Sequence, residues 1–249
     1  MVSNEKIKSI YLIAICGTGM ASLAGLLQKS GYRVTGSDTN IYPPMSTLLK
    51  SSGIDIKSGY QRENISDDID QVIIGNAVSK DNQEVLAVQE KNIPYISFPE
   101  AIKKFYLENQ KSLVIAGTHG KTTTSSMIGT VLSEGHLDPT LVVGGLVKTI
   151  DSNAKLGAGN LIVVEADEFD RSFLALRPTI SIITNIELEH IDCYDDLEDL
   201  QQAFIQFANA VPFYGAVIAC ADSTALMEIT PEIKRPVITY GLSVGANIR

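Results

Sequence analysis

Short apolar runs alternate with helix-like segments along the first half of the chain. The apolar runs predict strands at residues 10–16, 32–37, 54–57, 72–75 and 93–97. The segments between them predict helices at residues 20–30, 44–52, 83–91 and 99–106, several of which begin at a proline or end at a glycine. Alternation of this kind is typical of βαβ units, whose strands form a parallel sheet.

The second half of the chain repeats this alternation. Strands are predicted at residues 113–116, 141–143, 161–165, 180–185 and 216–220, with one more just before residue 241. One helix is predicted from Lys121 onward and another over residues 197–210. The second helix carries an apolar stripe at helical spacing, which indicates a core face: Leu197, Leu200, Phe204, Phe207 and Ala208. A polar linker at 107–111 separates the halves, so we predict two α/β domains over residues 1–108 and 109–249.

Composition excludes several classes of protein. A net charge of −9 and a pI near 4.8 argue against nucleic-acid binding through a basic face. The three cysteines (Cys16, Cys193 and Cys220) lie far apart, which favours reduced thiols over disulfides or a zinc site. No apolar run reaches the roughly 20 residues of a membrane span, and the first one is too short for a signal peptide. We therefore expect a soluble, cytoplasmic protein.

A glycine-rich loop at residues 115–124 (IAGTHGKTTT) predicts a phosphate site. It joins a predicted strand to a predicted helix, so the N–H groups of residues 117–120 and the helix N-terminus would surround an anion. Lys121 would reach the outer phosphates, and the Thr122 hydroxyl would bind Mg²⁺. The match to the G-x-x-x-x-G-K-[ST] pattern is incomplete, because Ile115 occupies the first glycine position. The loop nevertheless indicates a nucleoside triphosphate.

A second glycine turn follows the first predicted strand. Residues 17–22 read G-x-G-x-x-S, and Asp38 ends the next strand 19 residues after Gly19. This spacing suits a dinucleotide such as NAD(P), with Asp38 at a ribose hydroxyl, or another diphosphate such as a UDP-sugar. Close packing of helix on strand would explain the glycines equally well.

Acidic and imidazole side chains follow two later strands. Glu165 ends an apolar run, where a carboxylate would complete the Mg²⁺ shell begun by the loop threonine. Asn185 ends the strand predicted at 180–185 and His190 follows it, at the edge where active-site loops of α/β sheets lie. A lone histidine is more often structural. A nucleophile has no support, since the chain has no G-x-S-x-G motif and no paired cysteine and histidine.

Taken together, the motifs at 117–124, 165–168 (EADE) and 185–192 (NIELEHID) resemble the Mur ligases of peptidoglycan assembly. The resemblance covers essentially the whole chain and favours the branch acting on UDP-N-acetylmuramate. Residues 15–20 and 36–38 look like the UDP-binding domain of that branch. The resemblance therefore implies UDP in place of NAD(P) at the first turn.

The resemblance also implies roles for individual residues. Residues 1–108 would form a Rossmann-like UDP-sugar domain, and residues 109–249 an incomplete P-loop ATP-binding central domain. Lys121, Glu165 and His190 would be catalytic, and Thr122, Glu165 and His190 would hold magnesium. The ATP-binding set would be Gly117, Thr118, His119, Gly120, Lys121, Thr122, Thr123 and Asn185. The sugar-nucleotide set would be Gly17, Thr18, Gly19, Met20, Ser37, Asp38 and Asn76.

The implied reaction joins a carboxylate to an amine with ATP and Mg²⁺ as cofactors. The carboxylate of UDP-N-acetylmuramate would form an acyl phosphate, which the amine then displaces. Residues 42–47 and 75–77 resemble the ligase that attaches L-Ala-γ-D-Glu-meso-diaminopimelate, whereas residues 170–174 and 185–194 resemble the L-alanine-adding enzyme. We favour L-alanine. The family has three domains, so this chain is expected to stop inside the second, to bind ligands and to be inactive alone.

Other classes remain open on the residues alone. An NAD-dependent oxidoreductase would use the first turn but leaves the Gly-Lys-Thr loop unexplained. A P-loop ATPase or kinase would leave the first turn idle. A folate polyglutamylating ligase shares the ATP core but not such a first half, and a non-catalytic ligand-binding fragment is also compatible with the sequence.

Overall fold

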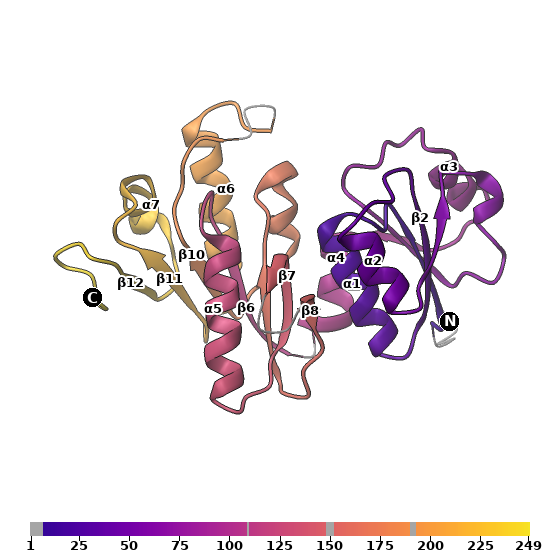
Figure 1. The fold of residues 1–249 in the computed structure, drawn as a ribbon. Coiled ribbons are helices and arrows are strands. Elements are labelled where there is room, and N and C mark those ends of the chain that lie inside the picture. The colour runs from indigo at the N-terminus through magenta and orange to yellow at the C-terminus, as the bar shows by residue number, and fades with distance from the viewer. Residues whose placement is uncertain (1–6, 109, 148–151, 190–192) are drawn as a thin grey trace. The chain divides into compact units, whose positions relative to one another are not determined.

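The computed structural model describes residues 7–108, 110–147, 152–189 and 193–249. The chain forms two compact units (Figure 1). Unit 1 comprises Met1–Ala101 and Gly144–Leu156, and unit 2 comprises Ile102–Val143 and Gly157–Arg249. Within the described ranges, no helix is both long and apolar enough to cross a membrane.

Unit 1 contains a five-stranded parallel sheet with the strand order β3-β2-β1-β4-β5. This confirms the parallel α/β architecture predicted for the first half. The strand order reverses between β1 and β4, which in such sheets creates a crevice at the carboxyl ends of the strands. The elements are β1 (Ser9–Ile13), α1 (Thr18–Lys29), β2 (Arg33–Asp38), α2 (Met45–Ser51), β3 (Asp55–Ser58), η1 (Arg62–Asn64), β4 (Gln71–Ile74), α3 (Gln83–Glu90), β5 (Tyr95–Ser97) and α4 (Phe98–Ile102).

Strand β1 ends three residues earlier than the apolar pattern predicts. Ala14 has a φ of 64°, in the left-handed region that interrupts a strand. The Gly17 N–H then donates to the Ala14 carbonyl, which turns the chain toward α1. The apolar run extends past the strand because Ile15 is also buried, and its N–H still donates to the Ser37 carbonyl of β2.

The second sheet has the strand order β12-β11-β10-β6-β9-β7-β8; strands β6 and β9 to β12 lie in unit 2, whereas β8 lies in the Gly144–Leu156 segment of unit 1. Strand β6 lies between β9 and β10 and pairs with both in parallel. The elements are η2 (Lys103–Leu107), β6 (Lys111–Ala116), α5 (Lys121–Glu134), β7 (Thr140–Val147), β8 (Ser152–Lys155), β9 (Leu161–Glu165), η3 (Phe169–Ala175), β10 (Ile180–Ile183), α6 (Leu197–Asn209), β11 (Ala216–Cys220), α7 (Thr224–Ile229), η4 (Thr230–Glu232) and β12 (Val237–Tyr240).

Three features of these elements were not predicted from the sequence. Strand β8 and helix α7 were not predicted, and β8 packs against α1, within unit 1. The helix predicted at 99–106 is α4 continued by the π-helix η2, so Leu107 is a buried helical residue and not part of a linker. Of the predicted α6 stripe, Leu197 is half-buried and the remaining four residues are buried.

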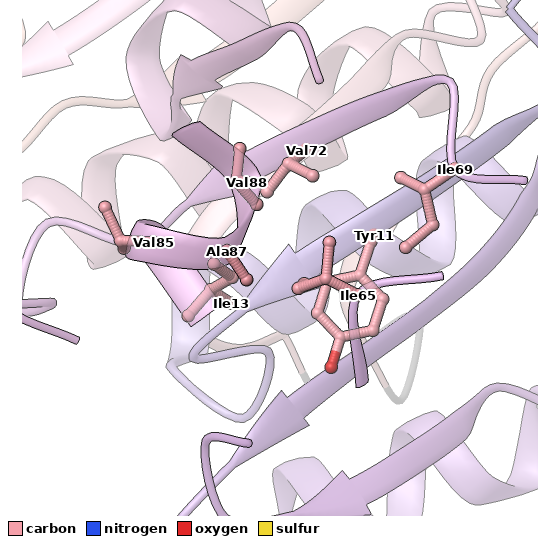
Figure 2. Packing of buried hydrophobic residues seen from close by; sticks show 8 residues of the cluster. All are labelled: Tyr11, Ile13, Ile65, Ile69, Val72, Val85, Ala87 and Val88. Atoms are coloured by element: carbon pink, nitrogen blue, oxygen red, sulfur yellow. The ribbon is translucent and has the colours of Figure 1, made fainter. Parts of the chain in front are cut away.

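Each unit has its own apolar core. In unit 1, side chains of α3 pack beside those of β1, β4 and the segment after η1, as Figure 2 shows. This cluster comprises Tyr11, Ile13, Ile65, Ile69, Val72, Val85, Ala87 and Val88. In unit 2, the Phe173 ring lies 5.2 Å from the ring of Phe204 and 5.0 Å from that of Phe207. All three phenylalanines are at most 1% exposed, so α6 and η3 share one aromatic core.

Truncation of this core should destabilise the protein strongly. We expect Phe204→Ala to lower the free energy of unfolding by about 3–5 kcal/mol, because it removes a buried ring and leaves a cavity. Urea denaturation followed by circular dichroism measures the loss. Phe213, which is 85% exposed, supplies the matched control, and Phe213→Ala should change stability by less than about 0.5 kcal/mol. Equal effects of the two substitutions would contradict this account of the core.

Candidate functional site

The phosphate loop predicted from the sequence lies between two strands that carry other predicted site residues. Ile115 of β6 is in register with Glu165 of β9, and Ala116 with Ile183 of β10. The loop leaves β6 directly after these positions (Figure 1). Parallel pairing therefore places Glu165 on one side of the loop and the segment that begins at Thr184 on the other.

Two loop positions require glycine. Gly117 has a φ of 134°, and a Cβ atom there would lie 2.1 Å from the Thr184 hydroxyl. Gly120 has a φ of 80° and forms the N-cap of α5. Because both conformations are strained for other residues, the loop depends on these two glycines.

The segment after β10 holds the loop through hydrogen bonds. The Thr118 and His119 N–H groups donate to the backbone and side-chain oxygens of Asn185, at 3.3 and 2.8 Å. The Thr118 hydroxyl accepts from the Glu187 N–H at 2.9 Å. These two loop N–H groups are thus engaged by Asn185, whereas the first N–H groups of α5 have no intrahelical acceptor. An anion would therefore meet the start of α5, with Asn185 supporting the loop from behind.

Lys121 forms a buried ion pair at the start of α5. Its Nζ lies 2.7 Å from Glu168 Oε2 and donates to the Thr118 carbonyl at 3.2 Å. The side chains of Lys121 and Glu168 are 14% and 2% exposed. Burial raises the pKa of Glu168, and the Lys121 ammonium opposes that shift. The Tyr194 hydroxyl donates to the Glu168 carbonyl and fixes this segment beneath the lysine.

Thr122 and Glu165 form the pair of oxygens expected for a magnesium site. The Thr122 hydroxyl donates to Glu165 Oε1 at 2.8 Å. A hydroxyl beside a carboxylate suits Mg²⁺, which binds one or two protein oxygens together with phosphate oxygens. Within the described parts of the chain, no group of three or more His, Cys, Asp and Glu side chains could hold a metal ion. His190 lies outside the described residues, so its metal role stays a prediction.

The remaining predicted ATP-binding residues lie at the surface of this site. The His119 side chain is about half exposed, with Nε2 3.6 Å from Glu187 Oε2 and 3.3 Å from Glu189 Oε1. Thr123 is exposed on the first turn of α5. The two carboxylates beside His119 make this rim acidic, whereas the Lys121 ammonium lies at the start of α5 against the Thr118 carbonyl.

In unit 1 a cavity of about 550 Å³ opens beside the first glycine turn. Gly17 and Asp38 line it, and no described lining residue is a lysine or an arginine. Thr18, Gly19 and Met20 begin α1, where their N–H groups have no intrahelical acceptor. Asn76 is exposed next to the lining. The lining residues are Ala14, Cys16, Gly17, Asp38, Thr39, Asn40, Tyr42, Tyr60, Ala77, Val78, Ser79, Asp81 and Asn82.

Asp38 and Ser37 support this cavity through internal hydrogen bonds. The Asp38 carboxylate accepts from the N–H groups of Cys16 and Asn40, at 2.9 and 2.8 Å. Ser37 is completely buried, and its hydroxyl donates to Glu84. As the structure stands, Asp38 orders the turn and Ser37 faces away from the cavity.

Glu84 is a functional candidate that the sequence did not single out. Its carboxylate is fully buried and accepts hydrogen bonds from Tyr11, Ser37 and Asn64. These donors come from β1, β2 and η1, so one carboxylate ties three segments together below the cavity. Its helix-capping residue Asn82 lines the cavity and accepts from the Glu84 N–H at 2.8 Å. The sequence does contain a signal for the capped start of α3, but that signal does not reveal that Glu84 is buried.

The chemistry of Cys16 provides a test of the environment of this turn. Burial and the nearby Asp38 carboxylate raise the pKa of the Cys16 thiol to about 11. Because the thiolate is the reactive form, we expect iodoacetamide to modify Cys16 at pH 8 roughly tenfold or more slowly than free cysteine, whose pKa is about 8.5. The rate should keep rising from pH 9 to pH 11. Peptide-resolved mass spectrometry measures it, and a rate that levels off below pH 9 would contradict the assignment.

Comparison with protein families gives two matches in chain order. Residues 9–109 match the Mur ligase family, catalytic domain, and residues 115–249 match the Mur ligase middle domain. The UDP-N-acetylmuramate–L-alanine ligase of Syntrophus aciditrophicus is 43% identical over 248 residues, which are 100% of this chain and 51% of that protein. The enzyme of the same name from Sulfurihydrogenibium is 45% identical over 98% of this chain and 53% of its own length. The chain thus spans about half the length of these relatives.

Solved structures of ligases named for UDP-N-acetylmuramate are also similar to this chain. The UDP-N-acetylmuramate:L-alanyl-gamma-D-glutamyl-meso-diaminopimelate ligase from Neisseria meningitides is similar with a TM-score of 0.87 and 31% identity, covering 94% of this chain and 78% of that chain. The UDP-N-acetylmuramate-alanine ligase from Thermotoga maritima has a TM-score of 0.81 and 26% identity, covering 96% and 53%.

Proposed function

Because the chain belongs to the Mur ligase family, we propose that it supplies the sugar-nucleotide and ATP sites of a ligase that joins UDP-N-acetylmuramate to L-alanine. The observation that carries this proposal is the contact between Thr122 and Glu165, which places a hydroxyl and a carboxylate together beside Lys121. Family membership disfavours an oxidoreductase or a free-standing kinase, neither of which would use both glycine turns. We place the activity in the cytoplasm, where ATP is available.

In the proposed reaction, the carboxylate of the sugar nucleotide attacks the γ-phosphate of ATP, which releases ADP and forms an acyl phosphate. The amine then attacks the acyl carbon, releases phosphate and forms the amide. Lys121 would hold the outer phosphates, and the N–H groups at the start of α5 would bind them from below. Thr122, Glu165 and His190 would hold magnesium. A bound Mg²⁺ neutralises the charge that builds up on the phosphate oxygens.

Unit 1 would bind the UDP part of the substrate at the first glycine turn. The N–H groups of Thr18, Gly19 and Met20 at the start of α1 would receive the diphosphate. The cavity of about 550 Å³ lies within the usual range of ligand sites, about 300–1,000 Å³. Tyr42 and Tyr60 in its lining offer aromatic surfaces for the base or sugar.

L-alanine is the proposed amine, and the tripeptide L-Ala-γ-D-Glu-meso-diaminopimelate is the second candidate. The relatives at 43–45% identity are L-alanine ligases, which supports the first. The structural similarity to the tripeptide ligase at 31% identity supports the second. Product analysis with the full-length protein and either amine, together with ATP and UDP-N-acetylmuramate, decides between them.

The first experiment is calorimetric titration of the 249-residue chain. We expect saturable binding of UDP-N-acetylmuramate and of Mg²⁺·ATP, and none of NADH. Lys121→Ala should weaken ATP binding by about tenfold or more, since a charge-assisted hydrogen bond contributes about 1.5–3 kcal/mol. Its affinity for the sugar nucleotide should be unchanged, because Lys121 lies in unit 2.

Lys111 provides the matched control for this substitution. It lies at the opposite end of β6 from the phosphate loop and is exposed. Lys111→Ala should bind both nucleotides as the wild type does. Equal loss of both ligands in Lys121→Ala would contradict the assignment of Lys121, and binding of NADH without the sugar nucleotide would overturn the proposed function.

A further inference from the structure

Asn153 of β8 is buried against the first glycine turn, although it lies 135 residues from Thr18 in the sequence. The segment Gly144–Leu156 belongs to unit 1, and β8 packs on α1 there. The Asn153 side chain is 0% exposed, and its Nδ2 donates to the Thr18 carbonyl at 3.0 Å. A polar residue thus occupies a site where an apolar one would pack without any desolvation cost.

The same side chain carries an unsatisfied acceptor. Asn153 Oδ1 is buried and accepts no hydrogen bond from any described residue. Native structures contain few such groups, and each calls for an explanation. An asparagine at this buried position is explained if its other polar atom, Nδ2, has a role that an apolar side chain lacks.

The hydrogen bond to Thr18 fixes the direction of a turn N–H group. The carbonyl of Thr18 and the N–H of Gly19 belong to one planar trans peptide, so the two point in opposite directions. The Ser22 hydroxyl donates to the same carbonyl at 2.9 Å. Two side chains therefore hold this peptide with its N–H directed toward the open end of α1.

The direction of that N–H group matters because no described residue that lines the cavity is cationic, although Lys50 lies close enough to act on the lining residue Cys16. The described lining of the cavity contains two aspartates, Asp38 and Asp81, and no lysine or arginine. A diphosphate bound there would depend on backbone N–H groups and on the helix N-terminus. Small rotations of the Gly19 peptide would then change affinity directly.

From these contacts we infer that Asn153 is a positioning residue for the sugar-nucleotide site: it orients the Thr18–Gly19 peptide for the diphosphate. The inference rests on the proposed function of unit 1 and adds a residue from a distant part of the chain to that site. Asn153 acts through the peptide and need not contact the ligand itself.

The test compares two substitutions in the 249-residue chain by calorimetry with UDP-N-acetylmuramate. Asn153→Ala removes the donor and should weaken binding about tenfold, as expected for the loss of one oriented hydrogen bond. Asn153→Asp keeps the shape but places an acceptor against the Thr18 carbonyl and a negative charge near the diphosphate, so it should bind more weakly still. The affinity for Mg²⁺·ATP should be unchanged in both variants.

Controls separate positioning from stability. The Asn209 side chain of α6 donates to the Glu232 carbonyl and accepts from the Lys234 N–H within unit 2, and Asn209→Ala should bind the sugar nucleotide as the wild type does. Urea denaturation gives the folded fraction of each variant. If Asn153→Ala is not folded, Asn153→Ser, which keeps a small polar group, replaces it and should show a weakened affinity as well.

The outcomes distinguish this inference from the proposed function. A wild type that binds the sugar nucleotide, with folded Asn153 variants of equal affinity, would overturn the positioning role alone. Parallel loss of sugar-nucleotide and ATP binding would assign Asn153 a purely structural role and also overturn the inference. A wild type that does not bind UDP-N-acetylmuramate would overturn the proposed function of unit 1, and the inference with it.

Discussion

The parallel register of β6 with β9 and β10 is the constraint on which the proposed ATP site depends. Register places Glu165 beside Ile115 and Ala116 beside Ile183, so three chain segments leave the sheet at the same edge. A shift of one residue would turn Glu165 to the opposite face of the sheet, because side chains alternate along a strand. The buried apolar residues of these strands fix the register. Packing of the core therefore also sets the positions of the residues at the site.

At this edge, hydrogen bonds and an ion pair within the chain hold the loop in place. Asn185 engages two loop N–H groups, and Glu168 holds the lysine. A triphosphate entering the site would share Lys121 with a buried carboxylate, whose charge opposes that of the phosphates. Preorganisation of this kind limits the reorganisation needed during phosphoryl transfer. Binding of a triphosphate would also require enough positive charge at the site to offset the carboxylates of Glu165 and Glu168.

The sequence predicted the main elements because apolar strands and glycine-bounded helices are local patterns. It also predicted that Gly17 lies in the turn that opens the first helix, that Lys121 begins a helix and that Glu165 ends a strand; the structure confirms these positions, whereas the roles remain predictions. Other features depend on contacts distant in sequence. Nothing local indicates that Glu84 is fully buried, because a glutamate in the first turn of a helix is usually solvated.

Strand β8 is a clearer example of a feature that the local sequence does not predict. Its sequence, Ser-Asn-Ala-Lys, has neither apolar alternation nor β-branched residues, so no pattern predicts a strand. Packing against α1 buries Asn153 nonetheless. The early end of β1 has a similar cause, since the left-handed Ala14 is set by the turn that follows and not by its own preference.

The two glycine turns share one backbone arrangement, in which a turn leads from a strand into a helix N-terminus. They differ in the charge of the side chains nearby. In unit 2 a buried carboxylate, Glu168, pairs with a lysine, which suits the shifting charge of a triphosphate. In unit 1 the buried carboxylate Glu84 accepts from neutral donors, and no described residue lining the cavity is cationic. A diphosphate that only has to be held needs oriented N–H groups, whereas a phosphoryl group that is transferred needs a mobile positive charge as well. Under the proposed function, the difference in charge between the turns would match the difference between holding a diphosphate and transferring a phosphoryl group.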